Sequence, residues 1–193
     1  MRAVPHAIDP DADQAPLRSV VIMGVTGCGK TAVAHALADT LGWRMIEGDS
    51  LHPPANVALM SVGIALDDEH RWGWLDAIGA ELVEAREASA SAVAACSALK
   101  RAYRDRLRGF ADDMLFVYLA IDRATAAERV AGRKGHFMPA SLVESQFAAL
   151  EAPGQDENAI ALDGTRSIAD LVAQLRPFLE AARPAMGEPT PLT

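Results

Sequence analysis

Short runs of apolar residues alternate along the chain with longer stretches in which apolar residues recur every three or four positions. The short runs predict strands at residues 19–23, 43–46, 91–96, 114–121 and 159–162. The longer stretches predict helices at residues 31–41, 71–88, 125–131, 140–150 and 168–179. Apolar strands that alternate with helices indicate an α/β fold with a parallel sheet covered on both faces. Ligands of such sheets bind beyond the carboxyl ends of the strands.

The two ends of the chain differ from this pattern. Residues 1–17 are polar and proline-rich, with no apolar core of a signal peptide, and predict a flexible N-terminal extension. Residues 182–193 are also rich in proline and predict a flexible tail. We therefore expect a single domain at 18–181. No apolar run approaches the ~18 residues of a membrane span, and the two cysteines predict no disulfide framework. These features favour a cytoplasmic protein without a membrane partner.

The charge of the chain indicates which classes of ligand are compatible with it. The formal net charge is -8, and no long lysine-arginine run occurs. A nucleic-acid-binding protein needs a basic face, so this class is not favoured. A small anionic substrate remains compatible, because a local cluster of cations can outweigh the global sign.

The segment after the first predicted strand fits the pattern G-x-x-x-x-G-K-[ST] at every required position. Its glycines allow backbone N–H groups to surround phosphate oxygens, and the following helix adds its positive end. Lys30 is expected to reach the β- and γ-phosphates, and the Thr31 hydroxyl to bind Mg²⁺. For Cys28 we favour a filler role over a redox-sensitive thiol. The predicted nucleotide ligands here are Gly24, Val25, Thr26, Gly27, Cys28, Gly29, Lys30 and Thr31.

A carboxylate follows the second predicted strand. Asp49 can accept the proton of a substrate hydroxyl or organise the Mg²⁺ shell, although an aspartate beside a glycine is also common in turns. His52 precedes two prolines, and the sequence leaves it open whether this histidine is a loop residue or orients a ligand.

Two further motifs are specific: Cys96-Ser97-Ala98-Leu99-Lys100 and Arg133-Lys134-Gly135-His136-Phe137. With them the chain, over about residues 19–179, resembles the gluconokinases of the P-loop kinase superfamily, in its group of shikimate-kinase-like and nucleoside-monophosphate-kinase-like enzymes. Glu47 and Leu59 depart from the family pattern, which usually has aspartate and lysine there, and both changes lie on the substrate side.

The resemblance implies a P-loop NTPase fold with a five-stranded parallel sheet, order 2-3-1-4-5, and a mobile lid at about 129–138. It implies ATP and Mg²⁺ as cofactors, D-gluconate as the substrate, 6-phospho-D-gluconate as the product and a homodimer as the assembly. Arg129 and Arg133 lie four residues apart, on one helix face. The resemblance makes them lid arginines that stabilise the transferring phosphoryl group; the alternative is a solvated basic turn.

Gluconate carries one carboxylate and several hydroxyls, so its site needs cations and polar side chains. For Lys100 and Arg104 a substrate role is preferred over a solvated helix face, the interpretation adopted for Arg106 and Arg108. Asp67 and Asp68 are equally compatible with capping the next helix and with a substrate role. The expected substrate ligands are Asp49, His52, Arg71, Ser97, Lys100, Arg104, His136 and Gln146.

Two alternatives remain at this point. The first is another small-molecule kinase, such as a shikimate-type enzyme. The second is a nucleotide-binding regulator without turnover, against which the intact Lys30, Thr31 and Asp49 argue.

Overall fold

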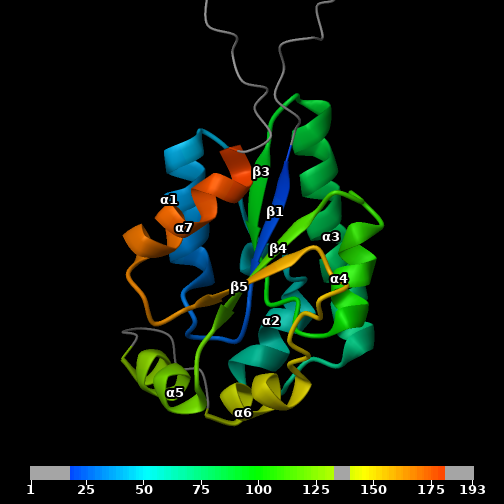
Figure 1. Ribbon diagram of the computed structural model, residues 1–193. Helices are drawn as coiled ribbons and strands as arrows, with labels where there is room; N and C mark the ends of the chain where they lie inside the picture. Colours follow the sequence, from blue (N-terminus) through cyan, green and yellow to red (C-terminus); the bar gives the residue numbers. More distant parts are fainter. Residues whose placement is uncertain (1–17, 133–139, 181–193) are drawn as a thin grey trace, which may run out of the picture.

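The computed structural model describes residues 18–132 and 140–180. Its centre is a five-stranded sheet in the order β2-β3-β1-β4-β5, with every neighbouring pair parallel (Figure 1). The predicted α/β fold and strand order are confirmed. The predicted extension, the tail and most of the predicted lid lie outside the described residues. The strands are β1 (Ser19–Met23), β2 (Arg44–Glu47), β3 (Ala92–Ala95), β4 (Leu115–Ala120) and β5 (Ala159–Asp163).

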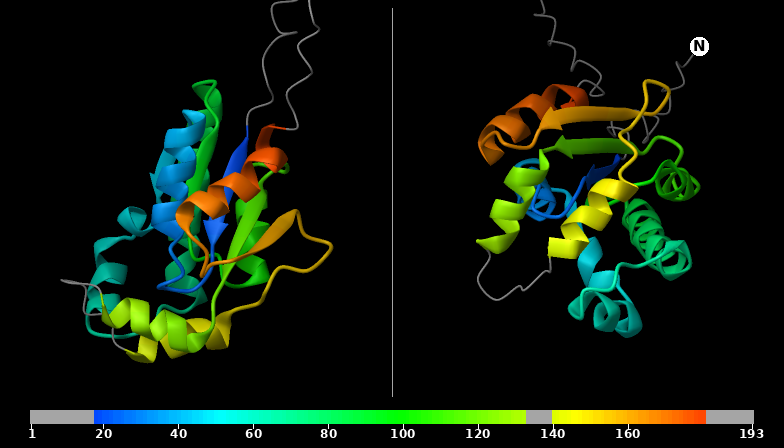
Figure 2. Two further views of the ribbon diagram at one scale, coloured as in Figure 1. Left: turned by 60° about the vertical axis from the view of Figure 1, so that its left-hand side comes forward. Right: turned by 90° about the horizontal axis from the view of Figure 1, so that it is seen from below.

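Helices cover both faces of the sheet. In Figure 1, α1 and α7 lie on one side of the strands, and α3 and α4 on the other. The α2, α5 and α6 helices gather at the carboxyl ends of the strands, as the second viewing direction also shows (Figure 2). The helices are α1 (Lys30–Leu41), α2 (Pro54–Ser61), α3 (Asp68–Glu87), α4 (Arg101–Arg108), α5 (Arg123–Ala131), α6 (Ala140–Ala149) and α7 (Ile168–Glu180).

Each face of the central strand β1 belongs to a separate hydrophobic core. Val20 and Ile22 are fully buried in the core that contains residues of α1 and α7. Val21 and Met23 are fully buried in the core that contains residues of α3 and α4. Side chains alternate along a strand, so a strand covered on both faces must be apolar at every position. This requirement explains the continuous apolar run that marks β1 in the sequence.

Two features near the second strand depart from the sequence prediction. The structure has a 3-10 helix at Gly48–Leu51 and the helix α2, neither of which the sequence analysis assigns. Pro54 occupies the first turn of α2, where its missing N–H has no helical partner to lose. Helix α3 begins three residues earlier than predicted, because the Asp67 side chain accepts the backbone N–H of His70 at 3.0 Å and caps it.

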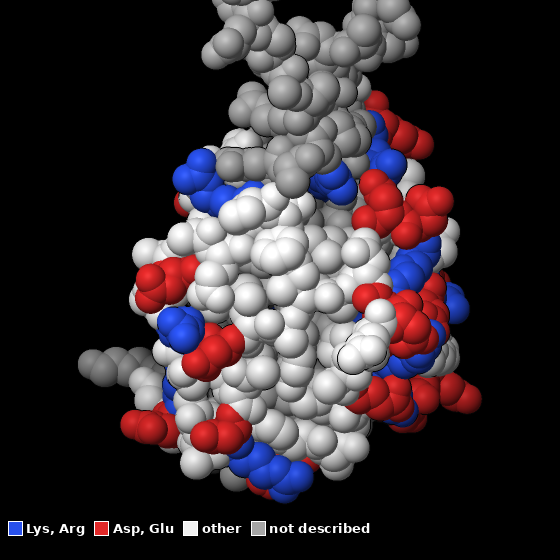
Figure 3. All heavy atoms as spheres, viewed as in Figure 1, with Lys and Arg blue, Asp and Glu red and all other residues white. Residues whose placement is uncertain are grey.

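The arginines of α4 are neutralised by acidic neighbours. Arg106 pairs with Asp76 of α3 at 2.6 Å, and Arg101 with Asp156 at 2.7 Å. Figure 3 shows that side chains of both signs intermingle along this side of the molecule. The helix therefore presents no uncompensated basic face. Within the described residues, no helix combines the length and apolarity that crossing a membrane requires.

Arg104 does not act at the surface. Its side chain is 1% exposed, and Nε and Nη2 donate to the two carboxylate oxygens of Glu157 at 2.6 and 2.7 Å. Its Nη1 donates to the backbone oxygens of Ala98, Leu99 and Glu151. The sequence analysis expected Arg104 to bind substrate, and the structure corrects this. The guanidinium is enclosed by partners and joins α4 to the segment before β5.

We predict that Glu157→Gln lowers the free energy of unfolding by about 3–5 kcal/mol, because it leaves the Arg104 charge buried without its counter-charge. Urea unfolding at pH 7 measures this value. The matched control is Glu144→Gln, which breaks an ion pair with Arg123 whose side chains are 60% and 61% exposed. We expect no measurable change in the control, since exposed pairs contribute little. Equal effects of the two variants would contradict the prediction.

The same pair sets the sign of a pH effect. Hydrogen bonds from Arg104, and further from Arg108 and the Gly154 N–H, hold the pKa of Glu157 well below its ordinary value of 4.5. A carboxylate with a lowered pKa in the folded state stabilises the fold above its ordinary pKa. We expect this contribution to be lost progressively as the pH falls below 4.5. Glu157→Gln removes that part of the pH dependence.

Candidate functional site

The loop between β1 and α1 passes through left-handed backbone conformations at Gly24, Gly27 and Gly29, with φ of 137°, 81° and 100°. A Cβ added at Gly27 would lie 2.9 Å from the backbone oxygen of Ala126, so a side chain has no room there. The strand, loop and helix follow in the order that a phosphate-binding loop requires. The loop thus has the geometry predicted for a nucleotide phosphate cradle.

Two cations border this loop. The Nζ of Lys30 donates to the backbone oxygen of Val25 at 3.1 Å. Arg129 reaches the loop from α5, and its Nη1 donates to the backbone oxygens of Gly164 at 2.9 Å and Gly27 at 3.4 Å. Of the three predicted phosphate-binding cations, Lys30 and Arg129 therefore lie against the phosphate-binding loop, and Arg133 lies outside the described residues.

The turn after β2 is held tightly against the sheet. A Cβ at Gly48 would lie 2.3 Å from the backbone oxygen of Ala95, so only glycine allows this approach to β3. The Gly48 backbone oxygen also accepts the indole N–H of Trp74 at 2.7 Å. The Glu47 side chain accepts the backbone N–H of Asp49 at 3.3 Å, and the Asp49 carboxylate remains exposed. This carboxylate is available to a substrate or a hydrated cation.

His52 is held as a neutral ring. It stacks on Trp74 with ring centroids 4.2 Å apart and an interplanar angle of 12°. The Nδ2 of the buried Asn56 donates to the His70 backbone oxygen and lies 3.4 Å from the Nδ1 of His52. Because Asn56 presents a donor, Nδ1 accepts and the ring proton sits on Nε2. Burial is the main cause that lowers the pKa of His52 from 6.5 to about 4. His52 thus offers an N–H donor at neutral pH.

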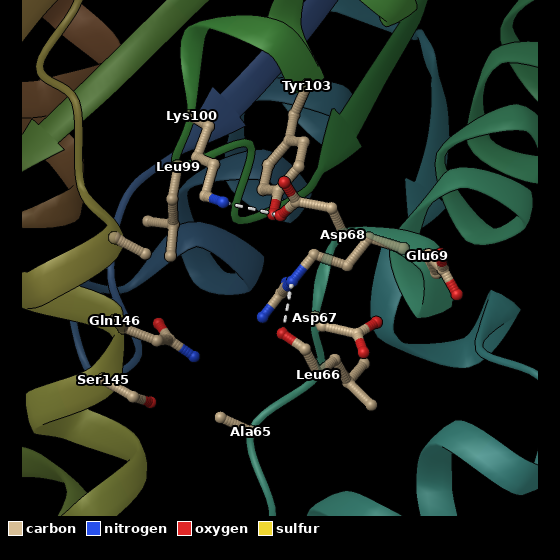
Figure 4. A pocket seen from close by; sticks show the side chains of 12 residues that line it. Ala65, Leu66, Asp67, Asp68, Glu69, Leu99, Lys100, Tyr103, Ser145 and Gln146 are labelled. Carbon is tan, nitrogen blue, oxygen red and sulfur yellow. Dashed lines mark hydrogen bonds and ion pairs between the residues drawn. The ribbon is translucent and has the colours of Figure 1, made fainter.

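A cavity of about 480 Å³ opens beyond the carboxyl end of β3 (Figure 4). Side chains from the start of α3, the start of α4 and α6 surround it. The guanidinium of Arg71 is fixed there by an Nε donation to the Leu66 backbone oxygen at 3.2 Å. The lining residues are Ala65, Leu66, Asp67, Asp68, Glu69, Arg71, Leu99, Lys100, Tyr103, Ser145, Gln146 and Ala149.

A polar cluster forms one wall of this cavity. The Nζ of Lys100 and the hydroxyl of Tyr103 both donate to Oδ1 of Asp68, at 2.6 and 2.5 Å. Both hydrogen bonds lower the pKa of the Asp68 carboxyl, and the bond from Lys100 has the larger effect. Burial and the bond to Asp68 raise the pKa of the Tyr103 hydroxyl, so it remains protonated. The wall therefore carries one fixed cation, one fixed anion and one fixed hydroxyl at neutral pH.

Gln146 connects the cavity to the phosphate-binding loop. Its side chain lines the cavity, and its Oε1 accepts the backbone N–H of Thr26 at 2.7 Å. Since Thr26 belongs to the loop, the two parts of the site share one hydrogen bond. Gln146 therefore contacts both the cavity and the phosphate-binding loop.

Comparison with known proteins identifies the family to which the chain belongs. Residues 20–153 match the AAA domain family. Gluconokinase of Gluconobacter oxydans is 51% identical over 77% of this chain and 84% of the relative. The thermosensitive gluconokinase of Escherichia coli is 39% identical over 86% of this chain and 89% of the relative. The chain belongs to the gluconokinase family.

Solved structures of similar proteins agree with the gluconokinase-family assignment. A gluconokinase from Sinorhizobium meliloti superimposes with a TM-score of 0.76 at 43% identity, covering 85% of this chain and 94% of that one. A sugar kinase from Janibacter superimposes with a TM-score of 0.81 at 41% identity, covering 90% of this chain and all of that one. The P-loop kinase fold and the family predicted from the sequence are therefore confirmed.

In this gluconokinase-family chain, the predicted substrate ligands separate into groups. Arg71, Lys100 and Gln146 line the cavity together. Ser97 does not line it: its backbone oxygen accepts the N–H of Gly24 at 3.2 Å and ties the end of β3 to the phosphate-binding loop. Arg104 is the buried structural cation described above. Arg133 and His136 lie outside the described residues.

The remaining predictions concern the loop cysteine and the aspartates before α3. Cys28 is 1% exposed, and its side chain packs in the core on the α1 side of the sheet, in agreement with the filler role. Asp67 caps α3, whereas Asp68 turns to Lys100 and Tyr103 in the cavity. Of the two roles that the sequence left open, Asp67 has the capping role, and Asp68 is the aspartate bound to other cavity residues.

Two polar residues of this gluconokinase-family site, Tyr103 and Asn56, were not predicted from the sequence as ligands or as supports of ligands. For Asp68 the sequence left a substrate role and a capping role equally open. Asp68 and Lys100 are 32 positions apart, so no local pattern could indicate that they meet. The helical spacing of Lys100 and Tyr103 was the available signal, because residues three apart at a helix start face the same way.

We predict that His52 titrates with a midpoint near 4, against its ordinary value of 6.5. Burial against Trp74 disfavours the imidazolium form. An NMR pH titration of the ring C–H resonances measures the midpoint, and the spectrum of His52→Gln identifies the signal. A neutral folded histidine also implies that stability falls as the pH drops below 6.5, since the unfolded chain binds the proton first. A midpoint near 6.5 would show that the stack leaves the ring hydrated.

Proposed function

We propose that this chain transfers the γ-phosphoryl group of ATP to D-gluconate, giving ADP and 6-phospho-D-gluconate. The observation that carries the proposal is the cation-bearing cavity that adjoins the phosphate-binding loop through Gln146. The names of the family relatives support gluconate as the acceptor. At about 480 Å³, the cavity falls in the size range of small-molecule sites.

The cavity suits a hydroxylated monocarboxylate. Arg71 and Lys100 supply the positive charge that a carboxylate requires, and the arginine offers a fork of N–H donors. The Nε2–H of the neutral His52 is a further donor near Asp49. A neutral donor is suited to a sugar hydroxyl, because it binds the oxygen without demanding a second negative charge.

On the nucleotide side, the loop amides and Lys30 hold the β- and γ-phosphates, and Arg129 approaches from α5. Arg133 is proposed, from its spacing to Arg129, as the second lid arginine. The Thr31 hydroxyl and the Asp49 carboxylate are the groups proposed to hold Mg²⁺ directly or through water. Mg²⁺ held by these groups together with ATP would neutralise charge that develops during phosphoryl transfer.

Asp49 is proposed to orient the terminal hydroxyl of gluconate and to accept its proton as the phosphoryl group arrives. The carboxylate is exposed at the carboxyl end of β2, and the turn that carries it is fixed by Gly48 and Trp74. Positioning of this kind supplies most of the rate in phosphoryl transfer, because the reaction passes through a loose transition state.

The first test is ADP release from the purified protein with Mg-ATP. We expect turnover with D-gluconate, and background rates with shikimate, D-glucose and no acceptor. The reason is that only gluconate offers both a carboxylate for Arg71 and Lys100 and a free primary hydroxyl at the end of a chain. Turnover with shikimate instead would favour the shikimate-type alternative. Nucleotide binding without turnover on any acceptor would favour the regulator.

Asp49→Asn is predicted to lower kcat with gluconate by about 10²–10⁴-fold while leaving the fold intact, the range expected for loss of a general base. Steady-state kinetics measure kcat, and circular dichroism checks the fold. Asp39→Asn is the matched control, because Asp39 is an exposed residue of α1. Activity of Asp49→Asn within a factor of a few of the control would exclude Asp49 as base or Mg²⁺ organiser.

A further inference from the structure

Within the described structure, only one of the two carboxylate oxygens of Asp68 is hydrogen-bonded. Lys100 Nζ and the Tyr103 hydroxyl both donate to Oδ1, at 2.6 and 2.5 Å. Among the described residues, no hydrogen bond reaches Oδ2, and the side chain is 47% exposed. Figure 4 shows the carboxylate at the cavity wall, with the dashed contact directed towards Lys100. One oxygen is fixed by the protein, and the other is available to a ligand.

Because the carboxylate is held in place, its Oδ2 is positioned to accept a hydrogen bond from a ligand. Two donors hold the carboxylate in place, and they lower its pKa, so it is ionised at neutral pH. Asp68 is also the first residue of α3, where the positive end of the helix stabilises an anion. Asp67 differs in its partners: its Oδ1 accepts the backbone N–H and the ring Nδ1–H of His70, which does not line the cavity. Asp68 is held by Lys100 and Tyr103, which both belong to the cavity wall.

Besides Asp68, the cavity lining contains the carboxylates of Asp67 and Glu69 and several donors. Arg71 and Lys100 have no acceptor atoms. Gln146 uses its Oε1 on the Thr26 N–H, which leaves its amide N–H groups facing a ligand. Ser145 donates its own hydroxyl proton to the Leu142 backbone oxygen. A ligand with several hydroxyl protons therefore meets many donors here. Among the three carboxylates of the lining, Asp68 is the one hydrogen-bonded to other lining side chains.

We propose that Asp68 is a specificity-determining substrate ligand, whose Oδ2 accepts the proton of one secondary hydroxyl of a polyhydroxy acid. The inference rests on the proposed function and adds to it: Lys100 and Arg71 select the carboxylate, and Asp68 selects the hydroxylated chain. A site that binds a hydroxyl disfavours an analogue that lacks it, because the analogue loses that hydrogen bond. Asp68 also repels a second anionic group on the ligand.

The test compares D-gluconate with its 2-deoxy, 3-deoxy and 4-deoxy analogues, for the wild type and for Asp68→Ala. With gluconate we expect kcat/KM to fall by about 10–100-fold in the variant, as for loss of a hydrogen bond to a charged group. For the one analogue that lacks the hydroxyl bound by Asp68, we expect kcat/KM to be lowered already in the wild type. The variant should then lose at most about twofold more, because the two changes remove the same bond.

Matched variants separate this role from a structural one. Asp68→Asn keeps an oxygen for Lys100 and Tyr103 and should show the same selectivity pattern with a smaller loss. Asp76→Ala removes a carboxylate of the same helix that pairs with Arg106, outside the cavity, and should leave all four substrates unchanged. Asp68 variants that lose the same factor on gluconate and on every deoxy analogue would overturn the inference, because that pattern means Asp68 acts only by positioning Lys100.

Wild-type turnover with gluconate is measured first, because it tests the proposed function separately from the role of Asp68. Wild-type turnover with gluconate, together with Asp68 variants that match the wild type, would overturn the role of Asp68 alone. Absence of wild-type turnover with gluconate would overturn the proposed function and this inference with it.

Discussion

The buried ion pair between Arg104 and Glu157 is the constraint on which the substrate side of the structure depends. An isolated charge in this position would be strongly unfavourable, so the two groups hold each other in place. Arg104 also binds the backbone oxygens of Ala98 and Leu99, immediately before Lys100. The position of Lys100 at the start of α4 is therefore set by a buried charge pair.

This arrangement gives the two halves of the site different supports. The phosphate-binding loop is built from backbone geometry: glycines, a strand and the amino end of a helix. The cavity is built from side chains on three helices, and their positions depend on contacts between residues far apart in the sequence. Loop geometry can serve many acceptors, whereas the side-chain half must be specific to one class.

The difference also explains how far the sequence alone could predict the structure. The loop at Gly24 and the apolar strand β1 follow local rules, and both were predicted correctly, as were the sheet order and the family. Arg104 was assigned to substrate, in preference to a solvated helix face, because it follows shortly after the end of a predicted strand. Its burial depends on Glu157, which lies 53 positions later. Asp68 was left undecided for the same reason, since its partner Lys100 comes from another helix.

The hydrogen bond between Gln146 and the Thr26 N–H has a thermodynamic consequence. A phosphate oxygen that takes this N–H must displace the Gln146 amide oxygen, and the released side chain then becomes free to bind on the cavity side. Conversely, an acceptor molecule that draws Gln146 away from the loop leaves the N–H ready for phosphate. Linkage requires these two effects to be equal in free energy. With such an exchange, occupancy of each half of the site would favour occupancy of the other.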